Sequence, residues 1–464
     1  MSRGNAATDA MVGRLEALLG ANFVASDAAA REEYAVDEIL PAAVVKPEKA
    51  EQVEAIIRFA GSEKLGVIPC GRGSKLGIGM PPERYDVALA MTGLKQIAYY
   101  DPDDLTLSVD AGMELSTLAE ALGAHRQFLP LALPFFDECT VGGAVASGVS
   151  SSLREGYGTA RDFLLGAEFV SGSGALTKSG GRVVKNVSGY DLHKLLIGSL
   201  GTLGAITRLN FRTSPSPQGY GDLVAGFSTV EALLQFHSLV KKSPLTPSAF
   251  QLLSPEAAKI VVEFREDRSA ALPVWFGEGL WHACVLFEGA EAVIRRYSTD
   301  LVAFAQQASA SSVQLLDIAA SESLSGALRE LLGLQAWSAP TATIFRIHAL
   351  PVFSTGVVRL QDFAKKCSFA CSIFGNASGP LYFSVHPGAS NEQTISALAQ
   401  LSADVFEYAA SQQGEVSIPF CPTELKRLVN VWGPAKKDAQ MMRRVKNAFD
   451  PENIFAPGRF VAGI

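Results

Sequence analysis

The sequence has few charged residues, no long apolar run and no excess of basic residues. Aspartate, glutamate, lysine and arginine make up 19% of the 464 residues, below the roughly 25% that is usual in soluble proteins. No stretch of about 18 consecutive apolar residues occurs, which excludes a membrane-spanning helix. The net charge of −7 argues against a nucleic-acid-binding protein, because such proteins present basic surfaces. With 48% hydrophobic residues, the chain has enough apolar side chains for a large core.

Cysteine and histidine are also sparse, with six residues of each. The cysteines do not cluster and residues 1–10 lack the apolar run of a secretory signal, so we expect reduced thiols and a cytoplasmic location. Cys367 and Cys371 form the one close pair, but the further cysteines that an iron–sulfur cluster or a zinc site needs are missing. We therefore expect no metal in this chain, and any iron–sulfur chemistry is expected from a partner subunit.

The first 215 residues alternate strand and helix patterns. An apolar strand at Ala43–Val45 precedes a helix whose apolar residues between Val53 and Ala60 share one face, and a second strand follows at Val67–Pro69. This is the pattern of a βαβ unit. Alternation from Leu105 to Val109 predicts a half-buried strand with another helix after it, so we expect the unit to repeat.

A Ser-Pro repeat at residues 214–217 interrupts this pattern and marks a domain boundary after residue 215. Residues 216–414 again alternate strands with helices, but they contain few glycine clusters. We expect an α+β domain there, with an antiparallel sheet and helices on one face, which caps the first domain. Residues 415–464 are expected to form a separate C-terminal segment with a basic helix.

Glycine is abundant, with 42 residues, and its first cluster lies at residues 69–77, directly after a strand. Successive glycines allow several backbone N–H groups to converge on an anion, and Arg72 and Lys75 add positive charge. The loop matches neither the Walker A pattern nor the Rossmann fingerprint, because its glycines are spaced G-x-G-x3-G. An ordinary glycine turn is the alternative for this loop on its own.

Two more clusters of small residues follow. In Thr140–Gly158, twelve of nineteen residues are Gly, Ala, Ser or Thr, which allows the backbone to lie flat against an extended polar ligand. A flexible linker fits this stretch poorly because valines and Tyr157 interrupt it. The third cluster has glycines at every third residue from Gly198 to Gly204, before a strand. Together the three clusters predict a ligand of the size of a dinucleotide that spans several strand ends.

These motifs resemble a known family. Residues 41–212 are similar to the FAD-binding domain of the vanillyl-alcohol oxidase / p-cresol methylhydroxylase (PCMH) type, and within that family to the FAD-binding subunits of bacterial glycolate oxidases. The resemblance rests on P-x-G-x-G-S at 69–74, T-V-G-G at 140–143, Y-G-x-x-R-D-x-x-L-G at 157–166, K-N-V-x-G-Y-D-L-x-K-L at 185–195, G-S-x-G-T-L-G-x-I-T at 198–207 and F-D-P-x-x-I-x-x-P-G-R at 449–459. It implies an α+β fold with a two-subdomain FAD-binding domain, an antiparallel-sheet cap and a C-terminal return to the FAD domain.

The resemblance also implies roles for individual residues. The pyrophosphate is expected at Gly71, Arg72, Gly73 and Ser74, the flavin and ribityl chain at Thr140, Gly142, Gly143 and Ser147, and the adenosine at Gly204 and Ile206. The candidate FAD-binding set also includes their neighbours Pro69, Cys70, Lys75, Val141, Gly148 and Tyr157. The first loop has no histidine, and Cys70 and Cys139 stand in no familiar linkage context, so we expect non-covalent FAD.

Flavin-dependent oxidation of a 2-hydroxy acid needs a base for the hydroxyl proton and a cation for the carboxylate. Related D-2-hydroxy-acid dehydrogenases carry paired histidines and a Gly-Asp-Gly-Asn stretch that bind a metal, and this chain has no such motif. His282, His348 and His386 fall in expected cap strands, where they either face the flavin or are structural. Arg346, on the same strand face as His348, is the best candidate for the carboxylate clamp, with His348 as the base. A surface arginine is the alternative.

Two functional hypotheses follow. In the first, which the missing metal motif and the low charge content favour, the chain is the FAD-binding subunit of a glycolate oxidase-like complex. It passes electrons or braces the complex, while a sister flavin subunit with the histidine motif performs the oxidation, and an iron–sulfur subunit is the further expected partner. In the second, it oxidises a small 2-hydroxy acid in its own cap. The loop spacing disfavours an NAD-dependent Rossmann dehydrogenase. Direct membrane insertion is not expected, and peripheral attachment to the inner membrane through partners is the alternative to a purely cytoplasmic location.

Overall fold

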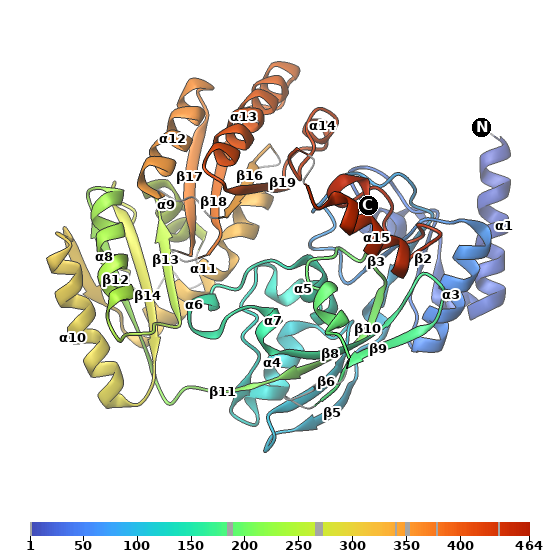
Figure 1. Ribbon diagram of the computed structural model, residues 1–464, viewed down its shortest axis with the longest axis horizontal. Helices are drawn as coiled ribbons and strands as arrows, with labels where there is room; N and C mark the ends of the chain where they lie inside the picture. Colours follow the sequence, from blue (N-terminus) through green and yellow to red (C-terminus); the bar gives the residue numbers. More distant parts are fainter. Residues whose placement is uncertain are drawn as a thin grey trace.

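The computed structural model of the protein describes residues 2–182, 189–264, 272–338, 341–348, 353–376, 379–434 and 437–464. Figure 1 shows two sheets in the N-terminal half and a larger sheet with its helices in the C-terminal half. The end of the chain, drawn in red, returns to the side of the N-terminal half.

The first sheet has four strands in the order β1-β2-β4-β3. β2 (Ala43–Val45), β4 (Val87–Ala90) and β3 (Val67–Cys70) are parallel, and β1 (Val24–Ala25) pairs antiparallel with β2. α3 (Ala50–Glu63) connects β2 to β3 and buries its predicted apolar face. The predicted βαβ unit is confirmed, and β4 lies between its two strands.

The second sheet has five strands in the order β5-β6-β10-β8-β9, and every pair is antiparallel. Its strands are β5 (Ile97–Asp101), β6 (Thr106–Asp110), β8 (Leu164–Val170), β9 (Leu176–Gly180) and β10 (Ala205–Arg212). α4 (Leu115–Gly123) and α5 (Val141–Ser147) pack on this sheet through a shared apolar core.

Two expectations for this region are wrong. The βαβ unit does not repeat, because the strand after α4, β7 (Gln127–Phe128), pairs with β11 (Ser214–Pro215) outside the sheet. The strand at β6 is buried on both faces, not half-buried. The buried polar groups of this strand are satisfied by β10: the Ser108 hydroxyl donates to the Asn210 side chain, and Asp110 forms an ion pair with Arg208.

The C-terminal half contains an eight-stranded sheet in the order β15-β12-β14-β13-β17-β18-β16-β19, in which every pair is antiparallel. Its strands are β12 (Tyr220–Phe227), β13 (Ala249–Leu253), β14 (Trp281–Glu288), β15 (Ser312–Leu315), β16 (Thr343–His348), β17 (Ala370–Asn376), β18 (Leu381–His386) and β19 (Glu415–Phe420). The antiparallel α+β cap is therefore present, and its sheet extends to Phe420.

Helices cover both faces of this sheet, so the expectation of helices on one face is wrong. One face packs against α8 (Val230–Lys242), α10 (Glu291–Gln307), α12 (Phe353–Lys366) and α13 (Glu392–Ser411). The other face packs against α9 (Pro255–Phe264) and α11 (Ile318–Ser338). Neighbouring residues of one strand point to opposite faces: Leu223 of β12 joins the first core and Val224 the second.

The chain after β19 includes α14 (Thr423–Lys426) and α15 (Ala439–Phe449) and then packs on the N-terminal half. Ile454 and Phe455 are fully buried in the core of the first sheet, where the Val67 amide donates to the Ile454 carbonyl at 2.8 Å. The remaining helices are α1 (Ser2–Leu19), α2 (Ala28–Glu33), α6 (Arg154–Tyr157) and α7 (Ala160–Phe163). No described helix is both long and apolar enough to cross a membrane.

Candidate functional site

The first glycine cluster leaves the end of β3 and contacts Thr140, the residue that caps α5. A Cβ atom at Gly71 would overlap the Thr140 hydroxyl, so only glycine permits this approach. Gly73 adopts φ +83°, a conformation that other residues rarely adopt. Gly71 and Gly73 are therefore required by the geometry of the loop, whereas a Cβ atom at Gly77 would meet nothing within 4 Å.

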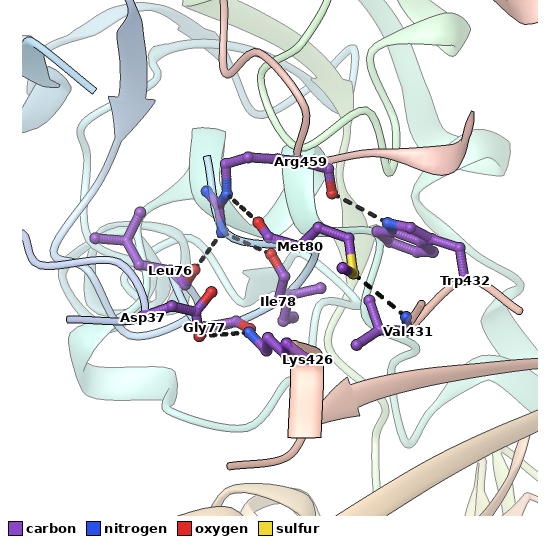
Figure 2. A network of polar contacts seen from close by, with 9 residues as sticks. All are labelled: Asp37, Leu76, Gly77, Ile78, Met80, Lys426, Val431, Trp432 and Arg459. Carbon is purple, nitrogen blue, oxygen red and sulfur yellow. Dashed lines mark hydrogen bonds and ion pairs between the residues drawn. The ribbon is translucent and has the colours of Figure 1, made fainter. Parts of the chain in front are cut away.

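The segment that follows this loop is held by two buried cations from the C-terminal part of the chain (Figure 2). The Arg459 guanidinium donates to the carbonyl oxygens of Leu76 and Ile78. Lys426 Nζ donates to the Gly77 carbonyl at 2.7 Å and to Asp37 Oδ1 at 2.6 Å. Burial lowers the pKa of Arg459, and the nearby Asp37 carboxylate opposes that shift.

The other two glycine clusters contact each other. A Cβ atom at Gly148 would lie 2.8 Å from the Gly198 Cα, and the Gly198 amide donates to the Val145 carbonyl at 2.9 Å. A third buried cation holds this region, since Lys446 Nζ donates to the Thr202 carbonyl at 2.8 Å. Burial lowers the pKa of Lys446, an effect that its ion pair with Asp450 opposes. The structure thus brings the three clusters to one place.

The clusters line two adjoining cavities. The first, of about 70 Å³, is lined by Pro69, Cys70, Gly71, Arg72, Gly73, Ser74, Lys75, Leu76, Cys139, Thr140, Gly143, Ala146, Ser147, Leu200 and Arg459. The second, of about 40 Å³, shares several of these residues and adds Met91, Ala111, Gly142, Gly201, Gly204 and Ile206. Residues from the ends of β3, β4, β6 and β10 thus surround one continuous groove.

A third cavity, of about 290 Å³, lies between the N-terminal half and the cap. Ser147, which also lines the first cavity, and Gly148 form part of one wall, and Arg346 and His348 of β16 form part of the other. The Nε atom of Arg346 is buried and has no hydrogen-bond partner among the described residues. The predicted pair Arg346 and His348 therefore faces the predicted cofactor loops across one cavity.

Two neighbouring strands add residues that the sequence did not single out. In the sheet register Arg346 lies opposite Tyr382 of β18 on one side and Ser417 of β19 on the other, and His348 lies opposite Glu415. All of them line the same cavity. Burial raises the pKa of Tyr382, against the opposing effect of the nearby arginines, so its phenol stays protonated.

Two residues of the candidate FAD-binding set lie elsewhere. Val141 is fully buried in the apolar core under α5. The Tyr157 hydroxyl donates to Glu288 Oε2 of the cap at 2.7 Å, and Tyr157 lines none of the three cavities. The K-N-V-x segment at residues 185–188 lies outside the described residues.

The other cap histidines do not line the cavity. His282 is fully buried beside Trp275 and Phe276, and burial lowers its pKa to about 4. His386 hydrogen-bonds Ser384 and Gln335. These two histidines are structural, which leaves His348 as the histidine of the cavity within the described residues.

Two cysteines line the groove. Cys70 is buried, its thiol donates to the Leu89 carbonyl at 3.6 Å, and burial raises its pKa. Lys75 Nζ donates to Cys139 Sγ at 3.1 Å, and Lys75 also lies over the Phe135 ring. The Cys70 thiol is therefore neutral and engaged with the backbone.

Family models match both halves of the chain. Residues 41–180 match the FAD binding domain, and residues 222–460, more than half of the chain, match the C-terminal domain of FAD linked oxidases. The chain belongs to the FAD-linked oxidase family. It is an FAD-linked oxidoreductase by this membership, and the expected PCMH-type fold is confirmed.

Named relatives include subunits of glycolate oxidase. The chain is 26% identical to glycolate oxidase subunit GlcD of Bacillus subtilis over 429 residues, which are 91% of this chain and 89% of the relative. It is 35% identical to glycolate oxidase subunit GlcE of Escherichia coli over 184 residues, 39% of this chain and 51% of the relative. A D-lactate dehydrogenase of Archaeoglobus fulgidus is 31% identical over 53% of this chain and 54% of the relative.

Solved structures share the fold. p-Cresol methylhydroxylase superposes with a TM-score of 0.77 at 16% identity and covers 99% of this chain and 97% of its own. Alkyldihydroxyacetonephosphate synthase superposes with a TM-score of 0.74 at 17% identity, and the match covers 97% of this chain and 84% of the synthase chain.

The groove of this FAD-linked oxidase fits FAD. Gly71, Gly73 and Gly143 line it without side chains, and Arg72 and Lys75 place positive charge beside the first loop. The Arg72 guanidinium forms an ion pair with the Glu114 carboxylate, N to O 2.6 Å, and both side chains are partly exposed at the edge of the groove. The residues that would hold the cofactor are thus those of the two adjoining cavities. The described residues contain no cluster of three or more histidine, cysteine or acidic side chains with the geometry of a metal site.

Proposed function

We propose that this chain oxidises a small 2-hydroxy acid in the cavity between its FAD-binding domain and its cap. The observation that carries the proposal is Arg346, whose buried Nε atom has no partner among the described residues and whose cavity is walled on the other side by Ser147 and Gly148. A guanidinium in such a position is suited to bind a carboxylate. The names of the relatives, which include glycolate oxidase subunits and D-lactate dehydrogenases, support the same class of substrate.

The two residues of β16 have separate roles in this proposal. Arg346 binds the substrate carboxylate and thereby fixes the neighbouring carbon and its hydroxyl. His348 accepts the hydroxyl proton, since it lies on the same strand and lines the same cavity. FAD, when bound, supplies the acceptor for the two electrons that leave with the C–H hydrogen. The product is the 2-keto acid.

We also propose that FAD is held without a covalent bond. Two observations on the groove support this: both thiols are buried, and each donates to a backbone carbonyl, Cys70 to Leu89 at 3.6 Å and Cys139 to Thr140 at 3.4 Å. Among the described residues that line the first two cavities there is no histidine. Neither cysteine is presented as a free nucleophile toward the groove.

A second candidate function is that of an electron-carrying FAD subunit in a glycolate oxidase-like complex. The similarity to GlcD over most of the chain and to GlcE over part of it supports this candidate, because both relatives are named as subunits. Its partners would be a sister flavin subunit that oxidises the acid and an iron–sulfur subunit that accepts the electrons. In that case the Arg346 cavity would not hold the acid.

Replacement of Arg346 tests the first candidate. R346M is expected to raise the KM for D-lactate or glycolate about 100-fold or more in the assembled enzyme, because it removes the charged partner of the carboxylate. The control is R296M, which removes an exposed arginine of α10 whose partner is Asp300 and should leave KM unchanged. An unchanged KM in R346M would contradict the first candidate and favour the second.

A further inference from the structure

A carboxylate of the cap holds a loop of the N-terminal half close to the groove. Glu330 of α11 accepts hydrogen bonds from two successive backbone amides, that of Phe135 at 2.5 Å and that of Phe136 at 3.3 Å. Successive amides that converge in this way form a small anion-binding concavity. Arg329 donates to Glu330 Oε1 at 3.0 Å, and its guanidinium lies over the Phe136 ring. The cap thus fills the concavity with a carboxylate of its own.

Phe135 has a backbone conformation that needs such support. Its φ is +60°, in the left-handed region that is unfavourable for a residue with a Cβ atom. Its ring is buried against the cap: a Cβ atom at Gly333 of α11 would lie 2.7 Å from the ring, and the ring centroid of Phe420 of β19 lies 6.2 Å away. Glu330 and Gly333 are three residues apart on α11 and share a face of the helix. One face of α11 therefore holds both the backbone and the ring of Phe135.

The Phe135 ring also contacts the first glycine loop. The Lys75 ammonium lies 5.2 Å from the ring centroid, within the range of cation–π attraction. Lys75 Nζ also donates to Cys139 Sγ at 3.1 Å and to Ser74 Oγ at 3.4 Å. Lys75, Ser74 and Cys139 all line the first cavity of the groove. Glu330 therefore reaches the groove through a single ring, because Phe135 joins α11 to the ammonium.

We propose that Glu330 is a positioning residue for FAD. From the cap it fixes Phe135, and through the Phe135 ring it fixes the Lys75 ammonium beside the loop expected to hold the pyrophosphate. A displaced ammonium attracts an anion less strongly, because the Coulomb energy falls with distance. The proposal needs FAD in the groove, but it does not depend on which molecule occupies the cap cavity.

Titration of the apoprotein with FAD tests this role without any substrate. E330A removes both hydrogen bonds and is expected to weaken FAD binding about fivefold or more. E330Q keeps one acceptor oxygen but loses the charge, so its dissociation constant is expected to lie between those of E330A and the wild type. The control is E322A, which removes a carboxylate of the same helix whose partner, the Tyr220 hydroxyl, belongs to the cap. E322A should leave FAD binding unchanged, and the melting temperature of each apoprotein shows that the variant is folded.

A double-mutant cycle with K75M separates positioning from a general effect on the fold. If Glu330 acts through Lys75, E330A weakens FAD binding in the wild-type background, whereas the double variant binds FAD as K75M alone does. The same loss in both backgrounds, or an unchanged dissociation constant in E330A, would overturn the proposal. A loss in E322A equal to that in E330A would also overturn it, because the loss would then reflect the stability of the cap. No hydroxy acid takes part in these titrations, so the proposed function is tested separately by reduction of the flavin with D-lactate.

Discussion

Gly71 and Thr140 lie in such close contact that no side chain fits at position 71. One residue belongs to the loop after β3 and the other caps α5, where its hydroxyl accepts a hydrogen bond from the Gly143 amide at 3.2 Å. This contact joins the two subdomains of the FAD-binding domain, and both backbones then face one groove. We therefore expect the binding of FAD to depend on this packing contact as well as on charges.

Replacement of Gly71 by alanine tests that dependence. The added Cβ overlaps Thr140 and must displace the loop or the cap of α5, at a cost of about 1–3 kcal/mol, or roughly 5- to 150-fold in FAD affinity. Titration of the apoprotein of each variant with FAD measures the dissociation constant for FAD. G77A is the matched control, since nothing lies within 4 Å of a Cβ there, and equal affinities in the two variants would contradict the role of the contact.

Arg459 is expected to act as a positioning residue for the same loop. Lysine cannot donate to several carbonyl oxygens in the forked geometry of a guanidinium, so R459K is expected to weaken FAD binding about tenfold or more. The apoprotein melting temperature is measured alongside, because a purely structural role would lower it in proportion. R444K, at an exposed position of α15, serves as the control. FAD affinity equal to that of wild type in R459K would refute the assignment.

Acid precipitation tests the non-covalent attachment of FAD. Denaturation opens the groove, so a dissociable flavin leaves with the supernatant and the pellet is colourless. Absorbance near 450 nm of both fractions gives the distribution. A yellow pellet after washing would show a covalent bond and overturn the proposal drawn from Cys70 and Cys139.

The burial of His282 leads us to expect that the stability of the protein depends on pH. Its Nε2 atom accepts the Gly277 amide at 3.1 Å, and burial lowers its pKa to about 4. The unfolded chain, with a histidine pKa near 6.5, therefore binds a proton that the folded protein does not, and stability falls as the pH drops below about 6.5. This group costs the folded protein about 2 kcal/mol between pH 7 and pH 5.

Urea unfolding at the two pH values measures that cost. In H282N the loss of stability between pH 7 and pH 5 should be smaller than in the wild type by about 2 kcal/mol. H125N replaces an exposed histidine and should retain the wild-type pH dependence. An H282N variant that loses as much stability as the wild type would contradict the burial of a neutral imidazole.

The parts of the site that were predictable from sequence are those fixed by local backbone geometry. The clusters around Gly71, Gly143 and Gly204 could be found because close backbone approach needs glycine wherever it occurs. Arg346 and His348 could be placed on one face because strand residues two apart share a face. Both line the cap cavity, while their chemical roles stay proposals.

The parts that were not predictable depend on contacts between distant segments. Lys426, Lys446 and Arg459 lie in a basic stretch typical of exposed helices, yet each is buried and holds backbone carbonyls of the FAD-binding domain. The closing P-G-R motif was the one signal for Arg459. Tyr157 was assigned to the groove from its motif, but the distant Glu288 holds it at the cap. Helix periodicity likewise does not reveal which face of a sheet a helix covers, so the second helical face, formed by α9 and α11, was not expected.

The central claim is that this chain oxidises the acid in its own cavity. Anaerobic mixing of the isolated FAD-loaded chain with D-lactate, followed by flavin absorbance, tests it most directly. The account predicts bleaching of the flavin without any added subunit, at a rate that saturates with D-lactate and reaches half-maximum only at far higher concentration in R346M. Bleaching that requires partner subunits, or that is identical in R346M, would contradict the account.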